Sequence, residues 1–376
     1  MTTTSPSLLT VHYENRYTAS IDDYFRDVLW IWQRDSTERT VFDLWFHVID
    51  HCSRLVEAVR KERPKFVIDD LANTFMWFLS FIAQTHQSEN DLDQYFHLDV
   101  LPSDIIWNKY PAHCPACFDF FMAEQIGARN PLDAEEIINQ RGEQLNDKIV
   151  KFANDPSVQQ PYVCACLSHI GFAEDRHAIY KPINEKLDGF RLVYANETRK
   201  NKIHSIKSLE EMFESVFHNS YEVFSIENIA FHLLEEVGEV TQSIKDLYTF
   251  DEDREPFSVT ASQRRRMKFE EELADVFSWI FALMLKIRRV YFKDAQEYVT
   301  SLVKGLEVNF MGSLNLADII WAKYGRTENG GTMFCSGCLR APCSCKRHLL
   351  VDWSKAQKAI VAGSDTKSQQ SYSDPS

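Results

Sequence analysis

The sequence predicts an all-α protein, and three observations lead to this expectation. Apolar residues recur at three- and four-residue steps over long stretches, as they do on a buried helix face. Glycine and proline, which interrupt helices, number only twelve each in 376 residues. The same succession of helix-like segments also occurs twice along the chain, which indicates a duplicated helical unit.

Composition limits the partners and the location. With 41 basic against 55 acidic residues the net charge is -14, so broad binding to nucleic acid is not expected. The N-terminus has no basic flank before an apolar core, unlike a signal peptide. The densest apolar run, 276–285, is about half the roughly 20 residues of a spanning helix. We therefore expect a cytoplasmic protein with no membrane segment.

The repeat divides the chain in two. HVIDHCSRLVEAVRK (47–61) aligns with HLLEEVGEVTQSIKD (232–246), and VIDDLANTFMWFLSFI (67–82) aligns with FEEELADVFSWIFALM (269–284). DIIWNKY (104–110) likewise matches DIIWAKY (318–324). These pairs predict two tandem helical bundles, at 1–175 and 200–354, joined by a linker at 196–202. An insert at 118–163 is expected to add a helix near 132–152, and the polar tail 361–376 is expected to be disordered.

The second bundle carries two pairs of carboxylates at helical spacing. Glu236 and Glu239 lie one turn apart beside an apolar stripe, and Glu272 and Asp275 repeat the same step on a helix that is apolar nearly all round. Four carboxylates converging in a bundle need protonation or a cation. Oxygen ligands without His or Cys favour Mg²⁺ or Mn²⁺, which also bind phosphate oxygens. The alternative is that such glutamates only coat a solvated helix face.

The two acidic motifs, EEVGE (235–239) and ELAD (272–275), resemble those of the MazG-like all-α nucleoside triphosphate pyrophosphohydrolases. WAKYG and the cysteines that follow it also resemble a tail of some family members. The resemblance covers about 205–345. It implies a helical bundle with Mg²⁺ on Glu236, Glu239, Glu272 and Asp275. It further implies water attack between the α and β phosphates, release of a nucleoside monophosphate and pyrophosphate, and pairing of two bundles.

Further residues are candidates for substrate binding. Lys323 and Arg326 follow the last repeated helix and would suit a phosphate, and Glu235 adjoins the acidic pair. The 32 residues between Glu239 and Glu272 are long for the family and could form a lid. The basic run 264–268 within them would suit a triphosphate or simply face solvent.

The first bundle has lost most of the acids. In register, His51 and Arg54 replace Glu236 and Glu239. Asp70 corresponds to Glu272, and Asn73 replaces Asp275. Because Arg54 puts positive charge where a cation would bind, this bundle is expected not to hold Mg²⁺ there. We expect a pseudo-module that is either a plain scaffold or contributes Arg54 or His51 to a shared site. The chain thus pairs its modules internally or forms a homodimer.

Eight of the nine cysteines form two quartets. One is Cys114, Cys117, Cys164 and Cys166, and the other is Cys335, Cys338, Cys343 and Cys345. Each would give Zn²⁺ four thiolates and no open position, which is typical of a structural site. Disulfides are the alternative, disfavoured in the cytosol, and redox catalysis by CPAC is another. Cys52 is expected to fill the core.

Three functions remain open from the sequence. The leading one is a Mg²⁺-dependent nucleoside triphosphate pyrophosphohydrolase acting in the second module. The alternative is a nucleotide-binding sensor or regulatory protein without turnover. A third is a zinc-ribbon protein that holds nucleic acid or a protein, for which only Arg340, Lys346 and Arg347 offer a basic face.

Overall fold

The structure is a computed structural model. It describes residues 11–32, 39–87, 100–125, 127, 131–155, 163–164, 184–248, 259–302, 314–326 and 331–344. The predicted disordered tail at 361–376, the centre of the candidate lid, Cys166 and Cys345 lie outside these residues.

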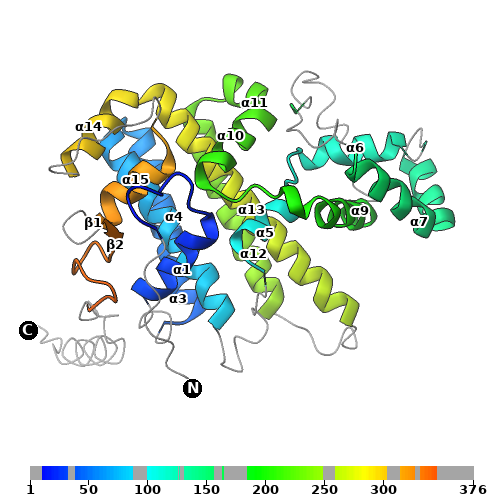
Figure 1. Cartoon of the computed structure of the whole chain (residues 1–376), viewed down its shortest axis with the longest axis horizontal. Helices are drawn as coiled ribbons and strands as arrows, with labels where there is room; N and C mark the ends of the chain where they lie inside the picture. The colour runs from blue at the N-terminus through cyan, green and yellow to red at the C-terminus, as the bar shows by residue number, and fades with distance from the viewer. Residues whose placement is uncertain are drawn as a thin grey trace, which may run out of the picture.

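The described residues are mostly helical, which confirms the all-α class (Figure 1). In chain order, the helices of the first half are α1 (Ile21–Ile31), α3 (Val41–Arg60), α4 (Pro64–Gln87), α5 (Pro102–Lys109), α6 (Pro115–Gln125), α7 (Pro131–Ala153) and α9 (Asn184–Glu197). The 3-10 turn η4 (Arg199–Asn201) is followed by α10 (Ile206–Val216), α11 (His218–Val223), α12 (Ile226–Tyr248), α13 (Val259–Val290), α14 (Phe292–Leu302) and α15 (Leu316–Tyr324). Two short antiparallel strands, β1 (Gly325–Arg326) and β2 (Thr332–Met333), complete the set.

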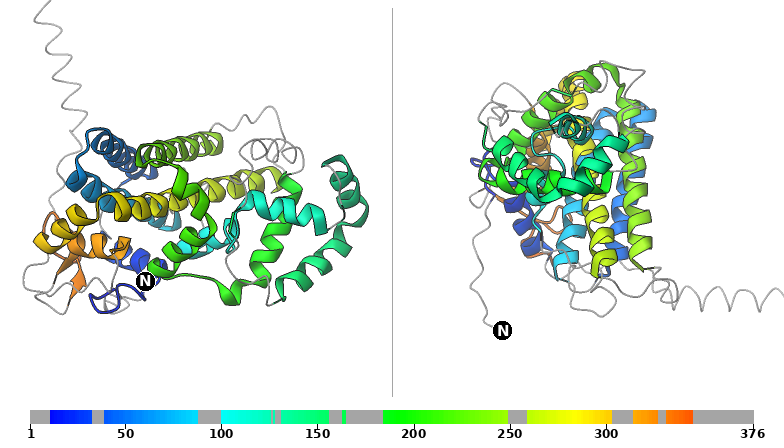
Figure 2. Two further views of the ribbon diagram at one scale, coloured as in Figure 1. Left: turned by 90° about the horizontal axis from the view of Figure 1, so that it is seen from above. Right: turned by 90° about the vertical axis from the view of Figure 1, so that its right-hand side faces the viewer.

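Two long helical hairpins form the centre of the molecule. The first is α3 with α4, the second is α12 with α13, and α3 packs along α12 (Figures 1 and 2). Helix α1 packs on α4, and α10 packs on α13. The two shorter repeated helices cross over, because α5 packs on α13 of the second half and α15 packs on α4 of the first.

Local sequence explains where the repeated helices begin. Thr40 precedes α3, and its hydroxyl accepts a hydrogen bond from the Asp43 backbone while the Asp43 carboxylate accepts from the Thr40 backbone. Asn315 and Asp318 form the same reciprocal cap at the start of α15. Such caps satisfy backbone N–H groups that have no partner within the helix.

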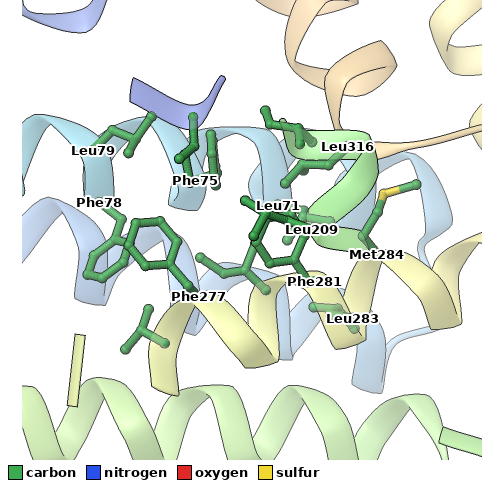
Figure 3. Packing of buried hydrophobic residues seen from close by; sticks show 14 of the residues in the cluster. Leu71, Phe75, Phe78, Leu79, Leu209, Phe277, Phe281, Leu283, Met284 and Leu316 are labelled. Carbon is green, nitrogen blue, oxygen red and sulfur yellow. The ribbon is translucent and has the colours of Figure 1, made fainter. Parts of the chain in front are cut away.

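One hydrophobic core runs through both halves. Phe78 on α4 meets Phe277 on α13 with ring centroids 4.7 Å apart, and Phe75 contacts the same ring edge-on at 6.3 Å. Figure 3 shows these rings pointing toward one another from α4 and α13, with Phe281 and Leu71 alongside. The halves are therefore not separate folding cores within the described residues, since their largest buried side chains pack against each other.

The insert adds a smaller helical layer at one end of the molecule (Figure 1). Helix α7 coincides with the helix predicted near 132–152. It packs with α6 and α9 around a second buried cluster that includes Phe118, Leu145 and Tyr194. The expected linker at 196–202 holds the end of α9 and the turn η4.

Within the described part of the chain, one helix is long and apolar enough to cross a membrane, the segment Pro64–His86 of α4. The most apolar window of this helix is 78% buried inside the protein, as in the core helix of a soluble protein. The cytoplasmic location stays a prediction from the sequence.

Candidate functional site

The acidic residues of the second half converge between α12 and α13. Glu236, Glu272 and Asp275 each offer a carboxylate oxygen, and these oxygens lie within 4.8 Å of one another. Glu239, one turn beyond Glu236, is exposed and its side chain shares a hydrogen bond with Glu272. The four carboxylates singled out from the sequence thus lie in one cluster, which we call the acid cluster.

Mutual repulsion and burial perturb this cluster. Burial, together with the charges of Asp275 and Glu239, raises the pKa of Glu236 to about 8. Burial also raises the pKa of Glu272 to about 7, with a further contribution from Asp275 and an opposing one from Lys109. Carboxyl groups this close cannot all ionise at neutral pH at low cost, so a bound cation would be stabilised here.

A lysine and a tyrosine of the first half complete the acid cluster. The Lys109 ammonium, at the end of α5, lies 2.5 Å from an Asp275 oxygen, and the Tyr110 hydroxyl donates to the other oxygen of Asp275. Burial alone would lower the pKa of Lys109, but Asp275, Glu271 and neighbouring acids raise it on balance. The site is therefore composite, with acids from one half and a buried cation from the other.

An aromatic pair borders the acid cluster. The Trp279 indole N–H donates to Glu236 at 3.1 Å, and the imidazole of His232 stacks on the same indole at 4.7 Å. His232 in turn lies 3.1 Å from the exposed carboxylate of Glu235. Glu235 thus points to His232 rather than into the acid cluster.

The two cationic candidates for phosphate binding lie elsewhere or cannot be placed. Lys323 pairs with Asp69 on α4 at 2.6 Å, in the first half and away from the acid cluster. The side chain of Arg326 lies outside the described part of the structure, as does that of Arg264. Arg266, from the same basic run, pairs along its own helix with Glu270.

The first half repeats the architecture of the acid cluster with different chemistry. His51 lies 3.2 Å from Asp70, and Arg54 turns outward to the exposed Asp50. Tyr324 donates to Asn73 at 2.8 Å, as Tyr110 donates to Asp275. Three of the four acids are absent here, and we call this arrangement the degenerate site.

The lysines show how different the two sites are. Lys323 contacts the Asp69 backbone oxygen at 3.4 Å, just as Lys109 contacts that of Glu271. Burial lowers the pKa of Lys323 despite its pairing with Asp69, whereas the pKa of Lys109 is raised. The acid cluster therefore favours the charged form of its lysine more strongly than the degenerate site does.

Three cysteines from each predicted quartet gather as expected. The sulfur atoms of Cys114, Cys117 and Cys164 lie within 4.8 Å of one another, and so do those of the second cluster, formed by Cys335, Cys338 and Cys343. None of these described cysteines is joined to another by a disulfide bond. Each cluster could hold a metal such as zinc. Cys52 is fully buried among apolar side chains, as expected.

Both cysteine clusters are tied to the opposite half. The Cys164 backbone N–H donates to the Val216 carbonyl at the end of α10. The Cys343 N–H donates in the same way to the Ile31 carbonyl at the end of α1. Cys114 and Cys117 follow Tyr110 closely in the chain, so the first cluster adjoins the segment that carries Lys109 to the second half.

Lys109, Tyr110 and Trp279 were not identified as site residues from the sequence. The repeat held the signal for the first two, because DIIWNKY aligns Lys109 with Lys323. The alignment could not show that α5, which carries Lys109, packs against α13 of the second half. Trp279 lies one turn after Asp275, and the repeat aligns it with Trp77.

Comparison with known proteins gave no match, whether with protein-family models, curated proteins or solved structures. The geometry of the sites is therefore the main guide to function.

Proposed function

We propose that the protein is a Mg²⁺-dependent nucleoside triphosphate pyrophosphohydrolase whose reaction takes place at the acid cluster. The observation that carries this proposal is the convergence of Glu236, Glu272 and Asp275 beside Lys109. Its products would be a nucleoside monophosphate and pyrophosphate. The choice of this reaction among phosphate chemistries rests on the MazG-like sequence motifs.

The donor set suits a hard divalent ion. All the ligands are carboxylate oxygens, which Mg²⁺ and Mn²⁺ prefer, and neither His nor Cys joins the acid cluster. The raised pKa values of Glu236 and Glu272 are what an acid cluster displays before a cation replaces its protons. A bound ion would polarise the phosphate chain and a water molecule.

The chain's own residues supply positioning and charge. Glu236, Glu272 and Asp275 would hold the ion, and Glu239 at the exposed edge would reach it or an attacking water. The Lys109 ammonium would contact phosphate oxygens in place of part of its contact with Asp275. This interaction with phosphate would strengthen as negative charge moves onto the leaving group. Tyr110 and Trp279 orient Asp275 and Glu236 through their hydrogen bonds.

A panel of canonical, deoxy and modified nucleoside triphosphates with Mg²⁺ tests the proposal directly. We expect pyrophosphate release from at least one of them, and a fall of at least about 100-fold in Glu239→Gln and Asp275→Asn. The matched control is Asp70→Asn, which removes the remaining acid of the degenerate site. Full turnover by folded acid-cluster variants would overturn the ligand set.

A nucleotide sensor without turnover is the second candidate, and one observation favours it. The ammonium of Lys109 already neutralises Asp275, in the place where a metal would contact that carboxylate. A site of that kind can bind a nucleotide without hydrolysing it. Tight binding with no pyrophosphate from any member of the panel would select this function.

We also propose that each cysteine cluster binds a structural Zn²⁺ ion. The fourth ligands would be Cys166 and Cys345, which lie outside the described residues. Support comes from the proximity of the three sulfur atoms in each cluster and from the Ser344 backbone N–H, which donates to the Cys338 sulfur at 3.3 Å. Metal analysis of purified protein tests this directly.

A further inference from the structure

The degenerate site contains a cavity of about 320 Å³, within the range of small-molecule pockets. Its walls come from both halves of the chain. His51 is supplied by α3, Asn73 and Trp77 by α4, and Lys323 and Tyr324 by α15. A side of the molecule that has lost its metal ligands therefore keeps a pocket.

One side of this cavity is lined by aromatic and apolar side chains. Trp32 and Tyr324 meet edge to face at 5.8 Å, and Met76 and Trp77 continue the lining. Trp77 is only partly buried, while the imidazole of His47 covers one ring face at 4.2 Å. Aromatic and thioether walls of this kind suit a planar ring.

The same cavity has hydrogen-bonding groups to spare. In the second half the Trp279 indole N–H donates to Glu236, but His51 stands at the position that corresponds to Glu236. The equivalent Trp77 N–H has no acceptor among the residues that the structure describes. The Ser80 hydroxyl donates to the Met76 carbonyl, which leaves its oxygen able to accept. A ligand that presents ring nitrogens or carbonyls would satisfy these groups.

The charged groups on the cavity wall limit how much negative charge a ligand can carry. Lys323 is held by Asp69, and Asp70 lies against His51, so no cation on the wall is without a counter-ion. Among the described residues that line the cavity Lys323 is the only lysine, too few for a triphosphate without a metal. A neutral or singly phosphorylated molecule fits this balance best.

We propose that the degenerate site is a metal-independent binding site for a nucleoside-sized aromatic heterocycle, as a nucleoside or a nucleoside monophosphate. Trp77 donates to the ring through its indole N–H, and the aromatic wall packs on its face. The site is separate from the acid cluster and does not depend on hydrolysis there.

Isothermal titration of the full chain with nucleosides and their monophosphates, in a buffer without Mg²⁺, Mn²⁺ or chelator, tests the proposal with no ion supplied to the acid cluster and leaves any zinc on Cys335, which also lines the cavity. We expect saturable binding that Trp77→Phe weakens about tenfold, because the substitution keeps the ring and removes the N–H. Trp279→Phe makes the same change beside the acid cluster and is expected to leave this binding unchanged.

A second variant tests the cavity in case the Trp77→Phe protein does not fold. Ser80→Leu leaves Trp77 intact and fills part of the cavity, so it should abolish binding while the melting curve stays cooperative. The absence of any binding in this buffer would overturn the proposal. So would equal binding of ribose 5-phosphate, or affinities untouched by both variants. A failed pyrophosphate assay bears only on the acid cluster, so the two proposals fail separately.

Discussion

Lys109, at the end of α5, lies 2.5 Å from the carboxylate of Asp275, which is 166 residues further along the chain. The equivalent lysine, Lys323, pairs with Asp69 in the first half, at the position that corresponds to Glu271 rather than to Asp275. Each half therefore provides the cation of the other half's site. The duplicated halves depend on each other for their sites as well as for their core.

Removing the cation from the acid cluster tests this dependence. We expect Lys109→Met to lower pyrophosphohydrolase activity by about 10- to 100-fold, because Asp275 loses the partner that positions it. Steady-state kinetics with Mg²⁺ provides the measurement. Lys323→Met is the matched control and should keep near-full activity, and equal losses in the two variants would contradict the assignment.

Stability should fall with rising pH when no metal is present. The folded-state pKa values of Glu236 and Glu272 are raised to about 8 and about 7, above the ordinary 4.5. Between these limits the folded protein binds more protons than the unfolded chain, so the free energy of unfolding decreases as pH rises. The slope is at most about 1.4 kcal/mol per pH unit for each carboxyl group.

Denaturant melts from pH 5 to pH 8.5, with EDTA or Mg²⁺, measure this slope. Mg²⁺ should suppress the part that arises from Glu236 and Glu272, and Glu236→Gln should remove its own share. Glu210 on α10 is not part of the acid cluster; it pairs with Arg288, and burial raises its pKa to about 8. The part of the pH dependence that arises from Glu210 should therefore persist in Mg²⁺. A slope that is insensitive to both metal and Glu236→Gln would contradict the account.

Loss of the first cysteine cluster should impair the acid cluster. Cys114 and Cys117 follow Tyr110 closely, so a metal there would fix the segment that carries Lys109. We expect Cys117→Ser to lose one of the two zinc equivalents and much of the activity. Cys338→Ser should also lose one equivalent but retain more activity, as measured by elemental analysis and kinetics. The reverse ranking would refute the anchoring role.

Restoring the acids should create a second metal site. The triple variant His51→Glu, Arg54→Glu and Asn73→Asp adds three carboxylates around Asp70, and Lys323 already holds the place that Lys109 holds in the acid cluster. We expect Mn²⁺ titration followed by electron paramagnetic resonance to show an additional bound ion. An unchanged stoichiometry in a folded variant would mean that the helices of the first half do not present these positions equivalently.

The shared core predicts a single unfolding transition. Phe277 contacts rings of the first half, so Phe277→Ala should cost about 3–5 kcal/mol and destabilise both halves together. Differential scanning calorimetry should show one transition, shifted to lower temperature. Two transitions, only one of which moves, would indicate separately folding halves.

Much of this protein was accessible from its sequence because helical signals are local. The apolar period predicted the helices, and the three-residue steps of Glu236 with Glu239 and of Glu272 with Asp275 predicted that each pair shares a helix face. The extra helix of the insert was also accessible, since α7 spans Pro131–Ala153 close to its expected range. The alignment of the repeats predicted which acids the first half lacks.

Only the tertiary structure decided which half completes which site. The sequence contains Lys109 and Lys323 at equivalent positions, but both a self-contained and an exchanged arrangement satisfy the same local pattern. Packing of α5 on α13 and of α15 on α4 selects the exchange, which places Lys109 at Asp275 and Lys323 at Asp69. Contacts between segments far apart in the chain depend on how buried faces fit together, and no local spacing specifies that fit.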